Sequence, residues 1–427
     1  MTRHSIFDTV HPLESITRKI VALLLLLAIL LTATSCSDDA DRESDHITDY
    51  GSYGANLAIE LATRFPYRKA FTNDAKRAGE FIKTAFEKLG YEPAVQSFYS
   101  TDSGGNTQNI SVHIPGTGFM TPDTTGNYIR TTKTVVVGAH YDTYFGSDEE
   151  EPMDGYSGIH DNASGIGALM TVANALTTER VPYDVILVAF GSGASEKTNY
   201  IGAERFIASH SQADISTWEA MYCIDSIYAG DKLYAHSGWN SLNTKNKYDK
   251  RRKLYEFYDI VYEYMLSSSE NGGMDILYNQ SGLSVDVDGD EDEDIYREVT
   301  KTTSDYRPFD KRGIPIVFIE SYDYNYSDLE DMKETKNLHL QTYEGNVRQT
   351  PLDNRVLLGE SLPITQLMQR INTVSFAIVK AIAKGSHDSV SVPDYEAGVR
   401  VAETVSVTSV TAPETKPTST KTTPTTK

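Results

Sequence analysis

The chain is poor in cysteine and in positive charge. Only two of its 427 residues are cysteines, Cys36 and Cys223, so it can form neither a disulfide framework nor a cysteine-based zinc site. Any metal ion would have to be bound by histidine and carboxylate side chains. The 39 Lys and Arg residues face 60 Asp and Glu residues, which gives a formal net charge of −21. Because an acidic surface repels a phosphate backbone, nucleic acid is not expected as the main partner.

Long apolar runs are also scarce, and the clearest one lies near the N-terminus. Residues 20–31 are apolar, follow a basic pair, and precede Cys36 by a few small residues. This run is short for a membrane span, and its charge order is typical of a signal peptide. Small residues directly before a cysteine resemble the bacterial lipobox, although Ala33 stands where leucine is usual. We therefore expect a lipoprotein signal peptide over 1–35 and an extracytoplasmic protein anchored through lipidated Cys36, with an ordinary secretory signal or an uncleaved anchor as the alternative.

The rest of the chain divides by composition. Residues 36–50 are polar and predict a tether, whereas 386–427 end in a Thr/Pro/Lys/Ser-rich stretch that predicts a disordered tail. Between them, 51–385 alternates apolar strand patterns with helical ones. Alternation of this kind predicts an α/β three-layer sandwich, in which a mostly parallel, mixed sheet is flanked by helices.

Individual elements follow from the apolar pattern. The run Thr134–Ala139 is continuously apolar, as expected for a strand buried on both faces. The other predicted strands cover 94–99, 109–114, 184–190, 220–224 and 314–319. The predicted helices include 75–89, 165–176, 203–209, 251–266 and 362–383.

Polar residues follow three of the predicted strands. His140 and Asp142 follow the first, Glu196 lies in the loop after the second, and Asp225 follows the third, while Asp161 stands at a helix start. Functional residues of parallel α/β sheets lie at the carboxyl ends of the strands. One imidazole with several carboxylates is a plausible oxygen- and nitrogen-rich site for a divalent metal ion. Asp142 is placed to accept the second ring N–H of His140 and so to fix its tautomer.

Each of these residues also has an ordinary explanation. Asp161 before Asn-Ala-Ser-Gly matches a helix N-cap, Asp225 can cap a loop, and Glu196 in a Gly/Ser loop can be a solvated charge. The prediction therefore depends on their order and context.

Five segments in chain order surround these residues: VVVGAHYDT, GIHDNASGIGALM, VILVAFGSGASEKTNYIGAERF, MYCIDSIYAGDKLYAH and SDYRPFDKRGIPIVFIE. Through them the chain resembles the co-catalytic zinc exopeptidases, which include bacterial leucyl aminopeptidase, aminopeptidase Y and glutamate carboxypeptidase II. The resemblance implies two zinc ions bridged by a carboxylate, and hydrolysis of a terminal peptide bond.

The resemblance also implies a role for each matching residue. His140 corresponds to the histidine of the first zinc and Asp142 to its orienting partner. Asp161 corresponds to the bridging aspartate and Asp225 to the later aspartate ligand. Two bridged cations would lower the pKa of a shared water to about 7, which is the physical reason for so many converging ligands.

The glutamate pair of the family is incomplete here. The family has two adjacent glutamates, a general base and then a zinc ligand, whereas this chain offers only Glu196. Counted from the preceding strand, Ser195 takes the place of the base and Glu196 that of the ligand. Counted back from the following helix, Glu196 becomes the base and Lys197, a cation, takes the place of the ligand. We favour Glu196 as a ligand and keep its catalytic role open.

The last zinc histidine is also missing from its usual place. The family ends with His-Thr-Pro-x-Asp, where this chain has Gln349 in place of the histidine and Asp353 at the end. His339 is the nearest substitute ligand. Tyr306 replaces another common histidine, and His160 is a spare imidazole directly before Asp161.

These features predict a zinc-dependent exopeptidase with one or two zinc ions, most simply an aminopeptidase-like hydrolase that removes N-terminal residues from peptide substrates. One alternative is a catalytically impaired lipoprotein that binds peptide or another ligand. Another is a one-zinc enzyme like the glutaminyl cyclases, which share the fold. The expected membrane contact is through Cys36 only.

Overall fold

The computed structural model describes residues 46–101, 105–144, 155–194, 200–242, 247–266, 268, 272–279, 283–285, 294–296, 298–325 and 332–398. Its centre is an eight-stranded sheet with the strand order β1-β2-β6-β5-β7-β12-β8-β9. The strands are β1 (Ala94–Ser100), β2 (Gly105–Ile114), β5 (Thr134–His140), β6 (Asp184–Phe190), β7 (Trp218–Ile224), β8 (Lys232–His236), β9 (Ile276–Leu277) and β12 (Ile316–Tyr322).

The middle of this sheet is parallel and most of its outer pairs are antiparallel. Strand β5 pairs in parallel with β6 and β7, and β7 pairs in parallel with β12. Strands β1, β2 and β6 are joined by antiparallel pairs, as are β12 and β8. Four neighbouring strands therefore end at one edge, which is where parallel sheets place their functional residues.

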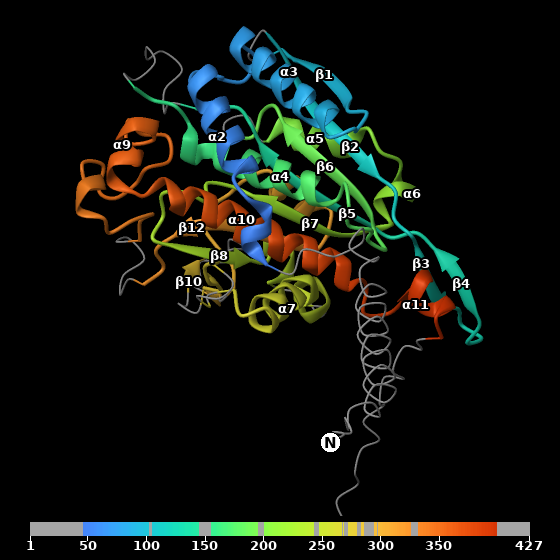
Figure 1. The fold of residues 1–427 in the computed structure, drawn as a ribbon. Helices are drawn as coiled ribbons and strands as arrows, with labels where there is room; N and C mark the ends of the chain where they lie inside the picture. The colour runs from blue at the N-terminus through green and yellow to red at the C-terminus, as the bar shows by residue number, and fades with distance from the viewer. Residues whose placement is uncertain are drawn as a thin grey trace, which may run out of the picture.

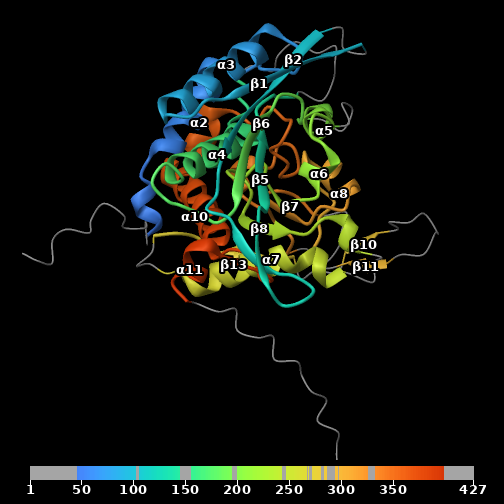
Figure 2. The ribbon, with the colours of Figure 1, turned by 90° about the vertical axis from the view of Figure 1, so that its right-hand side faces the viewer.

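Helices cover both faces of the sheet and form three layers (Figures 1 and 2). Figure 2 shows α2, α4 and α10 on one side of the strands, and α5 and α8 on the other. The first group comprises α2 (Tyr53–Arg64), α4 (Ser164–Ala175) and α10 (Ile364–Lys384); the second comprises α5 (Ile201–Ala208) and α8 (Tyr306–Lys311). Two further helices complete the layers. Helix α3 (Asn73–Lys88) packs against β2, and helix α7 (Lys247–Glu263) packs against α10 and β12.

The apolar pattern of β5 explains why the sheet is covered on both faces. Every residue of this strand is buried. Val135 and Val137 pack into the larger core, and Val136, which points the other way, packs into the smaller one with Phe190 and Phe309. Burial on both faces is what a continuous apolar strand requires.

The predicted fold class is confirmed, since the structure is an α/β sandwich with a mixed sheet between helical layers. All six predicted strands and five predicted helices are present within a few residues of their expected ends. The short strands β3 (Phe119–Pro122), β4 (Tyr128–Thr131) and β13 (Val390–Ser391), which form a small separate sheet, were not predicted. They are too short to show a periodic pattern.

The folded unit extends beyond the predicted boundaries at 51 and 385. At its N-terminal end the 3-10 helix η1 (Ile47–Tyr50) buries Ile47 and Tyr50, and at its C-terminal end β13 leads into α11 (Val392–Glu396). These two end segments carry only isolated apolar side chains among polar ones, so no periodic pattern predicts that they belong to the fold. The predicted signal peptide, Cys36 and the tail from residue 399 lie outside the described residues. Within the described part of the chain, no helix combines the length and the apolar character needed to cross a membrane.

Candidate metal centre

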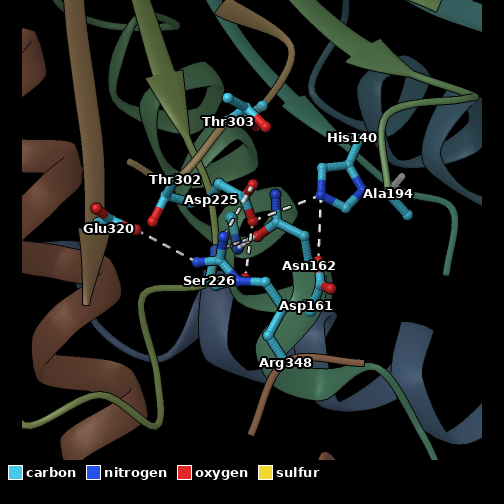
Figure 3. A network of polar contacts seen from close by, with 12 residues as sticks. His140, Asp161, Asn162, Ala194, Asp225, Ser226, Thr302, Thr303, Glu320 and Arg348 are labelled. Atoms are coloured by element: carbon cyan, nitrogen blue, oxygen red, sulfur yellow. Dashed lines mark hydrogen bonds and ion pairs between the residues drawn. The ribbon is translucent and has the colours of Figure 1, made fainter. Parts of the chain in front are cut away.

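Three of the predicted ligands meet at the carboxyl edge of the parallel strands. His140 ends β5, Asp225 follows β7, and Asp161 lies in the turn Ile159–Ala163 that leads into α4. The His140 Nε2 atom lies 3.2 Å from Asp161 Oδ1 and 3.4 Å from Asp225 Oδ1 (Figure 3). The ligand atoms of all three residues lie within 4.8 Å of one another.

This group has the properties of a zinc site. His140, Asp161 and Asp225 are only 1%, 1% and 3% exposed, and Asp161 Oδ2 has no hydrogen-bond partner among the described residues. Burial by itself would lower the pKa of His140, but the charge of Asp225 and contacts with Asp142 and Asp161 raise it well above its ordinary value. Buried carboxylates without a cation are costly, and one imidazole with two carboxylates is a donor set that zinc accepts. The residues therefore fit a zinc ion.

Asp142 connects the metal-site histidine to the loop after β6. Its carboxylate accepts hydrogen bonds from the backbone N–H groups of Gly193 at 2.8 Å and Ala194 at 3.2 Å. Its Oδ1 atom also lies 3.5 Å from His140 Nδ1, which contacts the Asp142 carbonyl oxygen at 3.2 Å. These contacts orient the ring so that Nε2 faces the two carboxylates, which is the role expected of a partner to a metal-bound histidine.

Glu196 lies outside the described residues, as do Ser195 and Lys197. The two alternatives for Glu196, zinc ligand or general base, therefore stay predictions.

Asn162 and Asp353 connect the turn before α4 to its surroundings. The Asp353 carboxylate accepts hydrogen bonds from the backbone N–H groups of His160 at 2.8 Å and Asp161 at 2.9 Å, and burial raises the pKa of Asp353 to about 6. Asn162 accepts a bond from Ser226 N–H at 3.0 Å and donates one to the carbonyl of Ile224 at 2.8 Å. The peptide bond between Asp161 and Asn162 is cis. Asn162 thereby connects the Asp161 turn to the end of β7.

Arg68 is a buried positioning residue that the sequence did not reveal. Its side chain is fully buried, and burial lowers its pKa. The guanidinium donates to the backbone carbonyls of Phe65, Tyr141, Ser157 and Gly158. Since Tyr141 follows His140 and Gly158 precedes Asp161 by three residues, Arg68 holds together the two segments that carry these ligands. A lone arginine between two helices carries no sequence signal for such a role.

A second arginine, Arg348, occupies the other half of the site. Its Nη1, Nη2 and Nε atoms lie 3.9 Å from Asp225 Oδ2, 3.5 Å from Glu320 Oε2 and 3.3 Å from Glu334 Oε1. Figure 3 shows the guanidinium between Glu320 and Asp225. Burial by itself would lower the pKa of Arg348, but these three carboxylates raise it well above its ordinary value.

His160 belongs to this second half and is not a free imidazole. Its Nδ1 accepts hydrogen bonds from the backbone N–H groups of Tyr228 at 3.3 Å and Ala229 at 3.2 Å. The ring proton must then be on Nε2, which lies 3.2 Å from Glu334 Oε1. Although Glu334 is buried, His160 and Arg348 lower its pKa to about 2. Both ring nitrogens are therefore engaged without a metal ion.

The structure does not bring His339 to the metal centre. His339 is exposed on the 3-10 helix η5 (Leu338–Leu340), outside the group formed by the three buried ligands. Gln349, in the place of the family histidine, donates from Nε2 to the carbonyl oxygen of Ala194 at 2.8 Å. The segment that returns to the site after η5 thus contributes an amide and the guanidinium of Arg348.

Asp305 is a further buried carboxyl group. In the sequence it was notable only as part of the segment SDYRPFDKRGIPIVFIE. It stands at the start of α8, is 0% exposed, and neither of its oxygens has a hydrogen-bond partner in the part of the chain that the structure describes. A Cβ atom on Gly193 would lie 2.3 Å from Asp305 Oδ2 and 2.5 Å from His140 Cβ, so the carboxyl group lies beside His140 across this glycine. Burial, aided by the carboxylates of Asp142 and Asp225, raises the pKa of Asp305 to about 8.

Comparisons with known proteins agree with this geometry. Residues 123–347 match the sequence profile of Peptidase family M28. The chain is also 22% identical over 355 residues to the alkaline phosphatase isozyme conversion protein of Escherichia coli (strain K12), a match that covers 79% of this chain and 92% of that protein.

Solved structures show the same fold. A glutaminyl cyclase from an Acidobacteriales bacterium matches with a TM-score of 0.53 and 17% identity, covering 79% of this chain and 95% of the cyclase. The zinc aminopeptidase BSAP from Bacillus subtilis matches with a TM-score of 0.51 and 13% identity, covering 78% of this chain and 96% of the aminopeptidase. At these identities the likeness concerns the fold alone, and two different chemistries occur on it.

Proposed function

The chain belongs to Peptidase family M28, a family of the co-catalytic zinc exopeptidase type, and on this premise we propose that it removes N-terminal residues from peptides as a zinc-dependent, aminopeptidase-like hydrolase. The observation that carries the proposal is the buried group of His140, Asp161 and Asp225. Three potential ligands from separate segments of the chain converge there, although buried carboxylates are costly without a cation.

His140, Asp161 and Asp225 would hold the zinc ion. When bound, zinc supplies Lewis-acid chemistry, polarising the scissile carbonyl group and making water more acidic. The protein supplies the arrangement around it. Asp142 fixes the ring of His140 through contacts at 3.5 and 3.2 Å, and Asp353 fixes the backbone of Asp161 at 2.9 Å.

We assign the proton exchange of the reaction to Asp305. Its carboxyl group is buried beside His140 without a hydrogen-bond partner among the described residues, and burial raises its pKa to about 8 in the zinc-free protein. Groups with such a pKa are efficient general acids and bases. This assignment leaves Glu196 free to act as a ligand.

The charge of the site favours the amino end of a peptide. Asp161 and Asp225 face His140, and Glu320 and Glu334 lie on the other side of Arg348. With carboxylates in excess, the site attracts a protonated α-amino group and repels a C-terminal carboxylate. Aminopeptidase activity is therefore preferred over carboxypeptidase activity.

Cyclisation of N-terminal glutamine is the second candidate. It is favoured by the presence, among the described residues, of one three-residue group that could hold a metal ion, which suits an enzyme with one zinc ion. The cyclase of similar fold shows that this scaffold accommodates such a reaction in another protein.

One assay distinguishes the candidates. The zinc-loaded protein is incubated with peptides that differ only in their first residue, glutamine included, and the products are identified by mass spectrometry. Hydrolysis releases the first residue with addition of water, whereas cyclisation releases ammonia and leaves the chain intact. We expect hydrolysis, abolished in Asp161→Ala and retained in the control Asp259→Ala, which alters an exposed residue of α7. A protein that binds zinc and peptide without either product would be a binding protein, and the proposal would be wrong.

We also propose that the protein works outside the cytoplasm, anchored to a bacterial membrane through a lipid on Cys36. The support is the order of charge, apolar run and small residues before this cysteine. Cys36→Ser should move the protein from the membrane fraction to the soluble fraction, whereas Cys223→Ser, at a buried thiol, should leave it at the membrane. Equal distribution of both variants would contradict the anchor.

A further inference from the structure

The second half of the site does not fit a second zinc ion in the way that the resemblance implies. The resemblance implies a nitrogen donor for such an ion, and the described candidates near this half have other contacts or are exposed. His236 Nε2 lies 3.2 Å from Glu320 Oε1 and pairs with that carboxylate. Both ring nitrogens of His160 have partners, the Gln349 amide donates to a carbonyl group, and His339 is exposed on η5. A guanidinium lies among the carboxylates instead.

We propose that the guanidinium of Arg348 takes the place of the second metal ion, so that the protein binds one zinc ion, at His140, Asp161 and Asp225. This inference rests on the proposed function, because it assumes that the first half of the site binds zinc. It deepens that function by stating how many ions the site holds and which side chain replaces the missing one.

The two oxygens of Asp225 carry the geometric argument. Oδ1 lies 3.4 Å from His140 Nε2, within the candidate zinc group, whereas Oδ2 lies 3.9 Å from Arg348 Nη1. A zinc ion bound by the His140 group would therefore share Asp225 with the guanidinium, one cation on each side. The resemblance implies Asp161 as the carboxylate between two ions, whereas here the carboxylate between two positive charges is Asp225, with an arginine as one of them.

The remaining contacts of Arg348 show that its charge is needed where it is. Glu320 is 0% exposed and Glu334 is 3% exposed, and both face the guanidinium. The Arg348 backbone N–H also donates to Glu334 Oε2 at 2.7 Å, so the same carboxylate holds both ends of the residue. An arginine stays protonated in such surroundings. Among the described residues its Nε and Nη2 atoms have no hydrogen-bond partner, so the contacts with Glu334 and Glu320 are ion pairs. The guanidinium therefore offsets part of the negative charge of this cluster.

The replacement has a consequence for the reaction. A guanidinium attracts negative charge but provides no open coordination position, so only the ion in the His140 group could act as a Lewis acid. The second half then contributes a cluster of ion pairs and no Lewis acid. The arrangement predicts an enzyme whose activity saturates at one zinc ion per chain.

Metal stoichiometry tests this directly. The purified protein is stripped with a chelator and titrated with zinc in a calorimeter, and the ion content is checked by elemental analysis. We expect one tightly bound ion per chain in the wild type and none in Asp161→Ala. Two tightly bound ions would overturn the inference about Arg348 and leave the zinc-dependent function intact, including the case in which Glu196 supplies a ligand. No bound ion would overturn the proposed function as well.

Arg348→Ala gives an independent measurement. Removal of the guanidinium leaves space among Asp225, Glu320 and Glu334, and we expect the variant to take up a second zinc ion, with a larger increase in Tm on zinc addition than the wild type shows. The matched control Arg312→Ala removes an arginine that pairs with Glu204 on the surface, and it should behave like the wild type. A variant that folds and still binds one ion, with the wild-type increase in Tm, would contradict the inference. If Arg348→Ala does not fold, the wild-type stoichiometry still decides.

Discussion

Two buried arginines support the two halves of the site in opposite ways. Arg68, behind the first half, donates to four neutral backbone carbonyls, and burial lowers its pKa. Arg348, inside the second half, faces the carboxylates of Asp225, Glu320 and Glu334, which raise its pKa despite its burial. The first arginine organises loops around a cation site, and the second one is itself the cation. A buried guanidinium near a metal centre can therefore signal either the support of an ion or its replacement, and its partners distinguish the two.

Arg348→Met should separate these roles most clearly. Methionine fills much of the space but leaves Asp225, Glu320 and Glu334 with histidine neighbours only. We therefore expect a loss of about 3–5 kcal/mol in the free energy of unfolding of the zinc-free protein. Urea unfolding measures it, with Arg312→Met as the surface control. A loss below about 1 kcal/mol would mean that the carboxylates do not depend on Arg348.

Arg68→Met should cost about 3 kcal/mol, because it leaves buried carbonyl groups without donors. The comparison is sharpened by adding excess zinc to both variants. The loss of stability in Arg68→Met comes from backbone carbonyls without donors. Excess zinc should therefore raise the Tm of this variant about as much as it raises the Tm of the wild type. If zinc raises the Tm of both variants by the same amount, the distinction between the two arginines is wrong.

Acid should weaken the second half through Glu334. Its pKa of about 2 lies below the ordinary 4.5, so its charged form stabilises the folded state above pH 4.5, and this contribution is lost as the pH falls from 4.5 towards about 2. The shift corresponds to about 3 kcal/mol. The difference in unfolding free energy between wild type and Glu334→Gln should therefore shrink over this pH range. The control Glu263→Gln, at an exposed ion pair, should show no such trend.

We expect Asp142→Ala to have the smallest effect, a change in the zinc affinity of the first half of the site alone. Removing the partner of a metal-bound histidine typically weakens metal affinity about 10–100-fold. Competition with a fluorescent chelator measures the change, and Asp259→Ala serves as the control. An unchanged zinc affinity would mean that the loop contacts of Asp142, and not its contact with His140, account for its burial.

The sequence was most informative where candidate ligand residues adjoin the ends of strands or the start of a helix. His140, Asp161 and Asp225 follow or precede strongly periodic elements, and the structure brings them within 4.8 Å of one another. His339 illustrates the opposite case. It was predicted as a substitute ligand because it is the histidine nearest to Gln349 along the chain. No sequence pattern fixes the direction of a loop side chain, and this one is exposed.

The sequence alone determined the α/β fold and the order of its main elements, because apolar periodicity depends only on neighbouring residues. It also indicated the first half of the metal centre through residues that adjoin buried strands. Only the tertiary structure decided the content of the second half. Arg348, Glu334 and Glu320 come from two loops and the strand β12, and they form one charge cluster only after the chain has folded. The physical reason is that the pairing of buried charges depends on distances across the fold, which no local pattern records.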